Sequence, residues 1–161
     1  MSVASPSAKR FALFACLAAG LIAAQGCASG RRVAPSTVPR GWPVPYDIAT
    51  ITSSFGVPRG RSRHEGIDLS APRGTKVRTT ADGRVRFAGK SGDFGRMVVI
   101  EHADGYQTRY AHLRSIEVEK GKKVKRGKVI GTVGKSGNAT GFHLHYEVRR
   151  NGVAIDPRPY L

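Results

Sequence analysis

The sequence predicts an all-β domain built from compact antiparallel sheets and short hairpins. Downstream of Tyr46, short runs of alternating apolar and polar residues are separated by Gly, Asp-Gly or Asn-Gly, a pattern typical of strands and tight turns. No window in this region sustains the 3.6-residue periodicity of an amphipathic helix. The region from Tyr46 to Leu161 also has the commonest size of a single domain, about 100–150 residues.

Residues 1–27 are organised like an export signal. Lys9 and Arg10 form a positive segment, and the uncharged apolar run that follows is shorter than the roughly 20 residues of a membrane span. Small residues then surround Cys27. We therefore expect a signal peptide over residues 1–27.

Cys27 has two interpretations. Ala24-Gln25-Gly26-Cys27 resembles the lipobox of bacterial lipoproteins, although Ala24 stands where Leu is usual. That resemblance implies a lipidated Cys27 and a membrane anchor. Since Ala28 and not Asp follows, it also implies the periplasmic side of the outer membrane. Ordinary signal cleavage, with release as a soluble exported protein, is the alternative.

Residues 28–45 contain four prolines and little apolar periodicity, which predicts an extended Pro-rich linker. The expected organisation is a signal peptide, this linker, and one domain over residues 46–161. Both cysteines, Cys16 and Cys27, precede the domain. The domain therefore has neither a disulfide framework nor thiolate metal ligands.

The chain is strongly basic, with 27 Lys and Arg against 11 Asp and Glu and a formal net charge of +16. Such a field concentrates polyanions near the surface and is screened by salt. Nucleic acid is the usual partner of a basic chain, but an exported protein meets acidic wall polymers, lipid headgroups and peptidoglycan carboxylates instead. We expect no nucleic-acid partner; a basic surface that only confers solubility is the alternative.

Two Asp-Gly pairs predict two hairpins with primed turns. Asp82-Gly83 joins the runs 76–81 and 84–88, and Asp104-Gly105 joins the runs 97–103 and 106–112. If Asp104-Gly105 is a two-residue turn, Met97 pairs with His112. His102 then pairs with Gln107 on the opposite face. Only one of the two histidines can line a given site, and we expect His102 to be structural.

Metal-type side chains occur in two clusters, His64-Glu65-Gly66-Ile67-Asp68 and His143-Leu144-His145-Tyr146-Glu147. In a strand alternate residues share a face, so the two histidines of the second cluster lie on one surface while Leu and Tyr pack behind. Gly66 and the apolar residues after it predict a loop that enters a strand. A catalytic zinc needs three ligands and an open position, and two His with one Asp satisfy this.

Four motifs together resemble the lysostaphin-type, LytM-like zinc metalloendopeptidases, which act on peptidoglycan. They are Ser53-Ser54-Phe55-Gly56, His64-Glu65-Gly66-Ile67-Asp68-Leu69, Tyr110-Ala111-His112-Leu113 and Ser136-Gly137-Asn138-Ala139-Thr140-Gly141-Phe142-His143-Leu144-His145. The resemblance covers residues 46–161 nearly end to end, with the motifs in the family's order. It implies a barrel-sandwich-like antiparallel fold with an active-site groove.

The resemblance also implies roles for five residues. One zinc (Zn2+) per domain is held by His64, Asp68 and His145, and His112 and His143 stand beside it as catalytic residues. One neutral imidazole can take a proton and return it to the leaving amine, while the other can donate to the oxyanion. Which histidine has which role is open at this point.

Two further residues have open roles. Glu147 continues the strand face of the two histidines, and it either orients a zinc ligand from behind or forms a surface salt bridge. Arg59 lies in a short arginine-rich loop between the first two motifs. It either binds a carbonyl or carboxylate of the substrate or belongs to a solvated basic loop.

The function that the resemblance implies is zinc-dependent hydrolysis of peptide cross-links or stem peptides of peptidoglycan, in company with other cell-wall enzymes. A non-catalytic module that binds the wall or activates an amidase is the alternative, but none of the five site positions is lost. A biotinyl-type carrier domain would explain the short sequence similarity between residues 73–77 and 120–124, each of which is expected to form a turn that leads into a strand. It would not explain the histidines.

Overall fold

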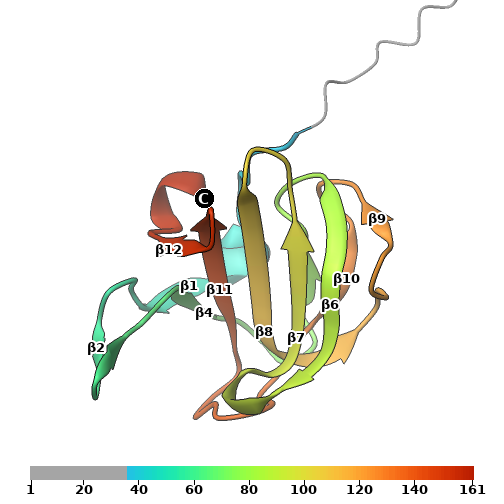
Figure 1. Cartoon of the computed structure of the whole chain (residues 1–161). Coiled ribbons are helices and arrows are strands. Elements are labelled where there is room, and N and C mark those ends of the chain that lie inside the picture. Colours follow the sequence, from blue (N-terminus) through green and yellow to red (C-terminus); the bar gives the residue numbers. More distant parts are fainter. Residues whose placement is uncertain (1–35) are drawn as a thin grey trace, which may run out of the picture. The chain divides into compact units, whose positions relative to one another are not determined.

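The computed structural model describes residues 36–161 (Figure 1). The expected signal peptide, Cys27 and the first part of the linker lie outside this range. No helix within it is long and apolar enough to span a membrane.

Strands and short 3-10 helices make up the regular structure of the described residues. In chain order they are η1 (Tyr46–Ile48), β1 (Thr50–Ser53), β2 (Pro58–Arg59), β3 (Ser62–Arg63), β4 (Ile67–Ser70), β5 (Lys76–Arg78), β6 (Gly83–Ser91), η2 (Gly92–Phe94), β7 (Gly95–Glu101), β8 (Tyr106–Ile116), β9 (Lys123–Val124), β10 (Val129–Val133), β11 (His143–Arg150), β12 (Val153–Ile155) and η3 (Arg158–Tyr160).

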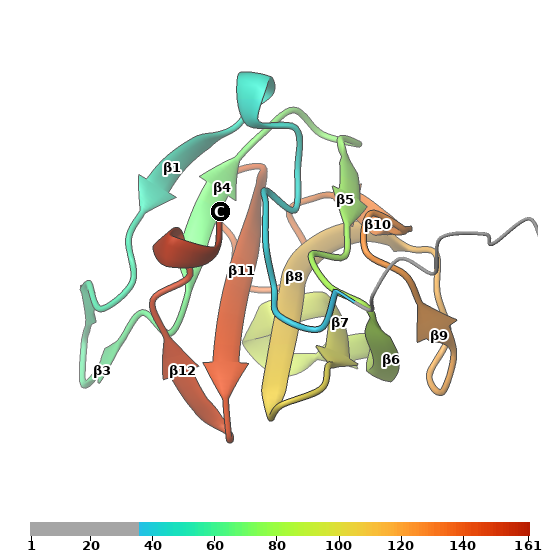
Figure 2. The same cartoon turned by 90° about the horizontal axis from the view of Figure 1, so that it is seen from above.

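One large sheet dominates, and all its strand pairs are antiparallel, as predicted. Its main path runs β1-β4-β11-β8-β7-β6-β9, with β12 beside β11 and with β10 joining β8 to β5. Figure 2 shows that the sheet curves around the interior, so that β5 and β10 face β11. The separate β2–β3 hairpin projects beside β1 and β4 (Figure 1).

The core lies on the concave inner face of the sheet. It includes Leu144 and Tyr146 of β11, which alternate along the strand and are 0% exposed. The phenol of Tyr146 lies 2.9 Å from Thr80 Oγ1, and that of Tyr110 accepts a hydrogen bond from Thr80 N at 3.1 Å. The polar ends of both tyrosines are therefore satisfied inside an otherwise apolar layer.

The packed chain begins upstream of Tyr46, where the domain was predicted to start. Val44 is 2% exposed and belongs to the core. Around it, Arg78 N donates to Pro43 O and Gly41 N donates to Tyr160 O, both at 2.7 Å. The second half of the predicted linker is thus part of the fold, because single apolar residues between prolines can pack without showing periodicity.

The first predicted hairpin is wrong. The strand at Lys76–Arg78 pairs with β10, and β6 pairs with β7 and β9. The carboxylate of Asp82 instead accepts hydrogen bonds from Arg126 N at 2.8 Å and Lys125 Nζ at 2.9 Å. An Asp-Gly pair marks a change of chain direction, but here the strands on its two sides pair with other strands and not with each other.

The second hairpin exists, but its register differs from the prediction by one residue. Asp104 and Gly105 have positive φ and form the primed turn. His102 N, however, donates to Tyr106 O, so Glu101 and not His102 pairs with Gln107. This bulge beside the turn shifts the pairing by one residue as far as Val98 and Tyr110, and the predicted register returns at Arg96 and Leu113.

A second irregularity in the same hairpin orients His112. Arg96 pairs with Leu113 and Val98 with Tyr110, so Ala111 and His112 together lie opposite one residue of β7. His112 has a φ of 59°, which is rare outside glycine. The conclusion that only one of His102 and His112 lines the site holds, although the predicted pairing of His102 with Gln107 was wrong.

The sequence similarity between residues 73–77 and 120–124 has a structural counterpart. Gly74 and Gly121 have φ values of 87° and 88°, and each ends a turn that leads into a short strand. The echoed valines, Val77 and Val124, are both buried in the core.

Candidate metal centre and groove

The outer face of the sheet collects the histidines at the junction of β4 and β11. His64 precedes β4, Asp68 lies within it, and Asp68 pairs directly with His145 of β11. This pairing brings together the two clusters that the sequence separates. The predicted alternation is also correct, because Leu144 and Tyr146 face the core while the histidines face outward.

Gly66 permits this close approach. A Cβ atom at this position would lie 2.4 Å from Tyr146 O and 3.0 Å from Cε1 of His145. Any larger residue would push the loop away from β11. The glycine between His64 and Asp68 is therefore required by contact with the strand that carries the third candidate ligand.

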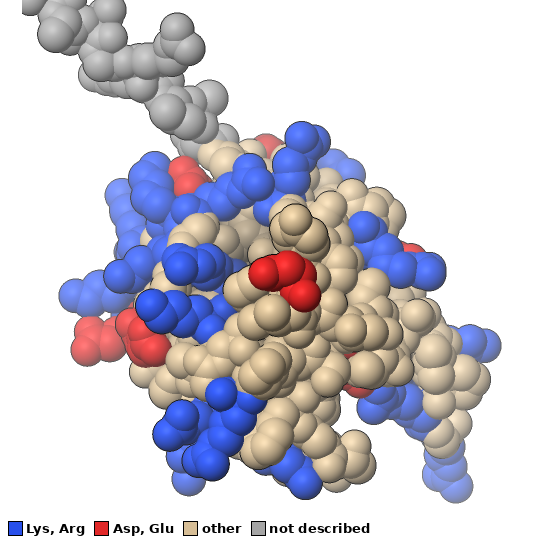
Figure 3. Space-filling view, turned by 180° about the vertical axis from the view of Figure 1, so that it is seen from behind, with Lys and Arg blue, Asp and Glu red and all other residues tan. Residues whose placement is uncertain are grey.

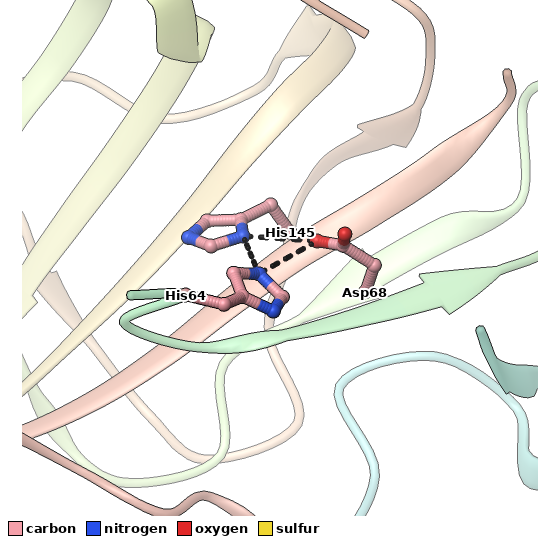
Figure 4. Close-up of side chains that lie close together, drawn as sticks. All are labelled: His64, Asp68 and His145. Carbon is pink, nitrogen blue, oxygen red and sulfur yellow. Dashed lines mark hydrogen bonds and ion pairs between the residues drawn. The ribbon is translucent and has the colours of Figure 1, made fainter. Parts of the chain in front are cut away.

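Three side-chain atoms converge on one point, as Figure 4 shows. His64 Nε2 lies 3.0 Å from His145 Nδ1 and 3.1 Å from Asp68 Oδ1, and His145 Nδ1 lies 3.0 Å from Asp68 Oδ1. Tetrahedral zinc with bonds of about 2.0–2.1 Å holds its ligand atoms about 3.3 Å apart. The observed triangle is close to that size.

Hydrogen bonds on the far side of each ring make these converging atoms acceptors. His64 Nδ1 lies 2.9 Å from the carbonyl oxygen of Ser54, and His145 Nε2 lies 3.1 Å from Glu147 Oε1. Both oxygens can only accept, so these ring nitrogens carry the protons. The lone pairs of the other two nitrogens then face the Asp68 carboxylate, an arrangement that a cation satisfies. The donor set fits zinc.

Asp68 is held as an anion. Its second oxygen, Oδ2, accepts from Arg59 Nη2 at 2.7 Å. Arg59, left open between substrate binding and a solvated loop, therefore contacts a candidate metal ligand.

Glu147 is fully buried behind His145. Burial would raise its pKa, yet the bonds from His145 and Arg149 and the charge of Arg109 lower it. Arg149 Nη1 donates to Glu147 Oε2 at 2.8 Å and also to Glu65 Oε2 at 2.8 Å. A carboxylate in this position fixes the ring of His145 and makes it a better ligand.

His112 and His143 lie beside the triangle as a pair, with ring centroids 4.8 Å apart. His112 Nδ1 donates to Ser136 O at 2.8 Å, and His143 Nδ1 donates to Gly141 O at 3.0 Å. Each ring therefore keeps Nε2 free. His143 Nε2 lies 3.8 Å from Asp68 Oδ1, which places it at the edge of the candidate centre.

Burial lowers the pKa of His112, and the hydrogen bond to the Ser136 carbonyl only partly offsets this. His112 is therefore neutral at neutral pH.

His102 lies outside the candidate site: its Nδ1 faces Asp82 O and its Nε2 faces Thr108 Oγ1, both at 2.8 Å. Its two ring nitrogens are used by the fold.

A groove of about 660 Å³ opens above the candidate metal centre. One wall is the β2–β3 hairpin with Arg59 and Arg63, and another contains Phe94 of η2. The ring of Phe94 packs 5.6 Å from that of His145. The site is thus open to a chain-like substrate on one side and covered by the sheet on the other.

Sequence reasoning missed four contributors to the site. Arg149 was detectable, because it continues the alternation of β11 beyond Glu147. The carbonyl groups of Ser54 and Ser136 lie within recognised motifs, but a backbone acceptor leaves no side-chain signal. Phe94 reaches the groove through a 3-10 turn that no local pattern indicated.

Known proteins resemble this chain in both sequence and structure. A model of Peptidase family M23 matches residues 62–157, more than half of the chain. The DD-carboxypeptidase/endopeptidase Mpg of Neisseria meningitidis is 50% identical over 94 residues, which are 58% of this chain and 22% of Mpg. The chain therefore spans about a fifth of that relative.

Two solved structures extend the comparison. A zinc-containing peptidase from Vibrio cholerae has a TM-score of 0.70 and 37% identity, covering 75% of this chain and 39% of that chain. The catalytic domain of the antimicrobial peptidase lysostaphin from Staphylococcus simulans has a TM-score of 0.65 and 30% identity. This match covers 70% of this chain and 91% of that domain.

Proposed function

The chain belongs to peptidase family M23, and from that premise we propose that it is a zinc-dependent endopeptidase that hydrolyses peptide cross-links or stem peptides of peptidoglycan. Family membership and the antiparallel architecture confirm the resemblance and the fold class that the sequence predicted. Mpg is named as a carboxypeptidase and endopeptidase, and the chain matches one part of it. The proposal therefore concerns this domain.

The observation that carries the proposal is the set of three acceptor atoms from His64, Asp68 and His145, within 3.0–3.1 Å of one another at the floor of an open groove. These residues would hold the zinc. When bound there, zinc supplies Lewis-acid chemistry, which polarises a carbonyl group and makes water nucleophilic near neutral pH.

The side chains around this centre provide proton transfer. His112 is best suited to take a proton from the attacking water, because it is neutral and its Nδ1 is fixed by Ser136, which leaves Nε2 as the acceptor. His143 presents its own Nε2 on the same side. A proton held there can be donated to the oxyanion or to the leaving amine.

Other residues keep the ligands in place. Glu147 fixes His145 through Nε2, and Ser54 fixes His64 through Nδ1. Arg59 holds Asp68 Oδ2, so that Oδ1 faces the histidines. We assign Arg59 and Glu147 to positioning and not to chemistry.

Zinc content and product analysis test the proposal together. The purified chain should contain one zinc and release peptides from purified peptidoglycan, identified by mass spectrometry of the soluble products. His145→Ala should do neither. Stoichiometric zinc without any cleaved peptide would leave the alternative of a non-catalytic wall-binding or amidase-activating module.

We also propose that the chain works in the cell envelope, attached through Cys27. The lipobox-like sequence supports this, as do relatives named for action on peptidoglycan, such as the DD-endopeptidase ShyC of Vibrio cholerae. Metabolic labelling with a fatty-acid probe should mark the wild type and not Cys27→Ser. Equal labelling of both, or an unlabelled soluble wild type, would contradict the anchor.

A further inference from the structure

A hollow of about 190 Å³ next to the catalytic histidines is lined by four basic side chains and one exposed aromatic ring. They are Arg73, Arg96, Arg114, Lys135 and Phe142, and we call this the basic hollow. All five side chains are exposed, and the guanidinium of Arg73 lies 6.0 Å from the centre of the Phe142 ring. Like charges gathered in one place repel one another.

These four cations have no anionic partner among residues 36–161. None of their side chains forms an ion pair there, and no Asp or Glu lines the basic hollow. Arg59 of the main groove and Arg149 behind it differ, because Arg59 is paired with Asp68 and Arg149 with Glu147. Figure 3 shows that Lys and Arg gather in groups on the face drawn there, with few acidic side chains among them. The positive charge of the basic hollow is therefore not neutralised by acidic side chains among residues 36–161.

Its position links it to the reaction centre. Ser136, which lines the basic hollow, accepts the hydrogen bond from His112 Nδ1 at 2.8 Å. Phe142 directly precedes His143 in the chain. The basic hollow is therefore joined to His112 through Ser136 and to His143 through the chain itself.

Charge is distributed unequally between the main groove and the basic hollow. Acidic Glu65 and Asp93 line the main groove beside Arg59 and Arg63, whereas the charged side chains that line the basic hollow are all cations. A substrate with a fixed negative charge would be drawn toward the basic hollow. Exposed pairs are screened by salt, so the attraction should select an orientation more than it adds affinity.

We propose that the basic hollow binds a free carboxylate of the substrate peptide close to the bond that is cleaved. This rests on the proposed function, because it names the part of the peptide that the same groove recognises. Guanidinium groups match carboxylates with paired hydrogen bonds, and the Phe142 ring can cover the adjoining aliphatic part. Phosphate of a wall polymer shares the anionic chemistry but would not need to lie beside the catalytic histidines.

Two cross-linked peptides that differ only in one group test this proposal. One has a free carboxylate next to the scissile amide, and in the other this carboxylate is amidated. Cleavage of both, and binding of their non-hydrolysable analogues, are measured on the zinc-loaded full chain. The Arg73→Gln/Arg114→Gln double variant is compared with Lys120→Gln/Lys123→Gln, which removes the same charge from exposed residues around β9.

The wild type and the lysine variant should prefer the free acid by about tenfold in kcat/KM and in binding, as expected for a charge-assisted hydrogen bond at an exposed site. The arginine variant should lose the preference. An unchanged preference in that variant, or none in the wild type, would overturn the proposal. So would displacement by inorganic phosphate without any selectivity between the peptides. Selective binding without cleavage of either peptide would refute the proposed function and leave the carboxylate subsite standing.

Discussion

Both faces of β11 are buried, but the inner face is apolar and the outer face is charged. On the inner face, Leu144 and Tyr146 are 0% exposed and pack into an apolar core. On the outer face, His145 and Glu147 are 6% and 0% exposed and lie in a network of charges. Packing stabilises a fold, whereas a buried charge network adds little net stability and serves specificity or chemistry. The inner face should therefore determine folding, and the outer face metal binding.

Neighbouring substitutions on the two faces should separate these roles most strongly. His145→Ala should abolish stoichiometric zinc binding and hydrolysis, because it removes one of the three proposed ligands. Leu144→Ala should lower the free energy of unfolding by about 2–5 kcal/mol, the cost of a buried cavity, while zinc stoichiometry stays at one. Metal analysis and denaturant unfolding of both variants measure the two effects.

The comparison between faces would fail if the two variants behaved alike. Zinc retained in full by His145→Ala would remove that residue from the ligand set. Zinc lost from a folded Leu144→Ala variant would show that the outer face depends on the core as a unit.

Within the outer face, the two histidines proposed to transfer protons should behave differently from the proposed zinc ligands. His143→Ala and His112→Asn should keep zinc and lower turnover by about 100-fold or more, the usual effect of losing an acid-base group. Asn is chosen at position 112 because it tolerates the positive φ found there. A loss of zinc in either variant would make that histidine a ligand.

The buried carboxylate behind His145 should have a smaller effect. Glu147→Gln keeps the shape but weakens the hold on His145 Nε2, and zinc affinity should fall by about 10-fold to 100-fold. Competition with a zinc-sensitive dye measures this. An unchanged zinc affinity in this variant would mean that Glu147 only forms a salt bridge with Arg149 and does not orient His145.

His102 should give the smallest effect, visible only as pH dependence. Burial lowers its pKa in the fold, although the hydrogen bond from its Nδ1 to Asp82 O partly offsets this. As pH falls below about 6.5, the unfolded chain takes up a proton before the folded chain does, so unfolding is favoured. In zinc-loaded protein, the His102→Gln variant should lose less stability than the wild type between pH 7 and pH 5. An equal loss of stability in the variant and the wild type over this pH range would contradict this.

Local patterns predicted much of the site. Strand alternation placed His143, His145 and Glu147 on one face, because that period is a property of the extended backbone itself. The family resemblance then joined this face to His64 and Asp68. The burial of Glu147 was left open in the sequence, since it depends on Arg149 and Arg109 around it.

Pairing between distant segments could not be predicted in the same way. Asp82-Gly83 has the residues of a hairpin turn, but its carboxylate binds the chain at Arg126, 44 residues away. The bulge that turns His112 toward the groove arises from the register of β7 and β8. Register depends on which strand a segment meets, and that information is not local.

Zinc X-ray absorption spectroscopy of the metal-loaded chain tests the central claim most directly. His64, Asp68 and His145 should give two imidazole nitrogens and a carboxylate oxygen in the metal's coordination shell, at bond lengths of about 2.0–2.1 Å. This is the result that the converging acceptor atoms predict. Three or four imidazoles in the shell would contradict it, because His112 or His143 would then be a ligand and not a free proton carrier.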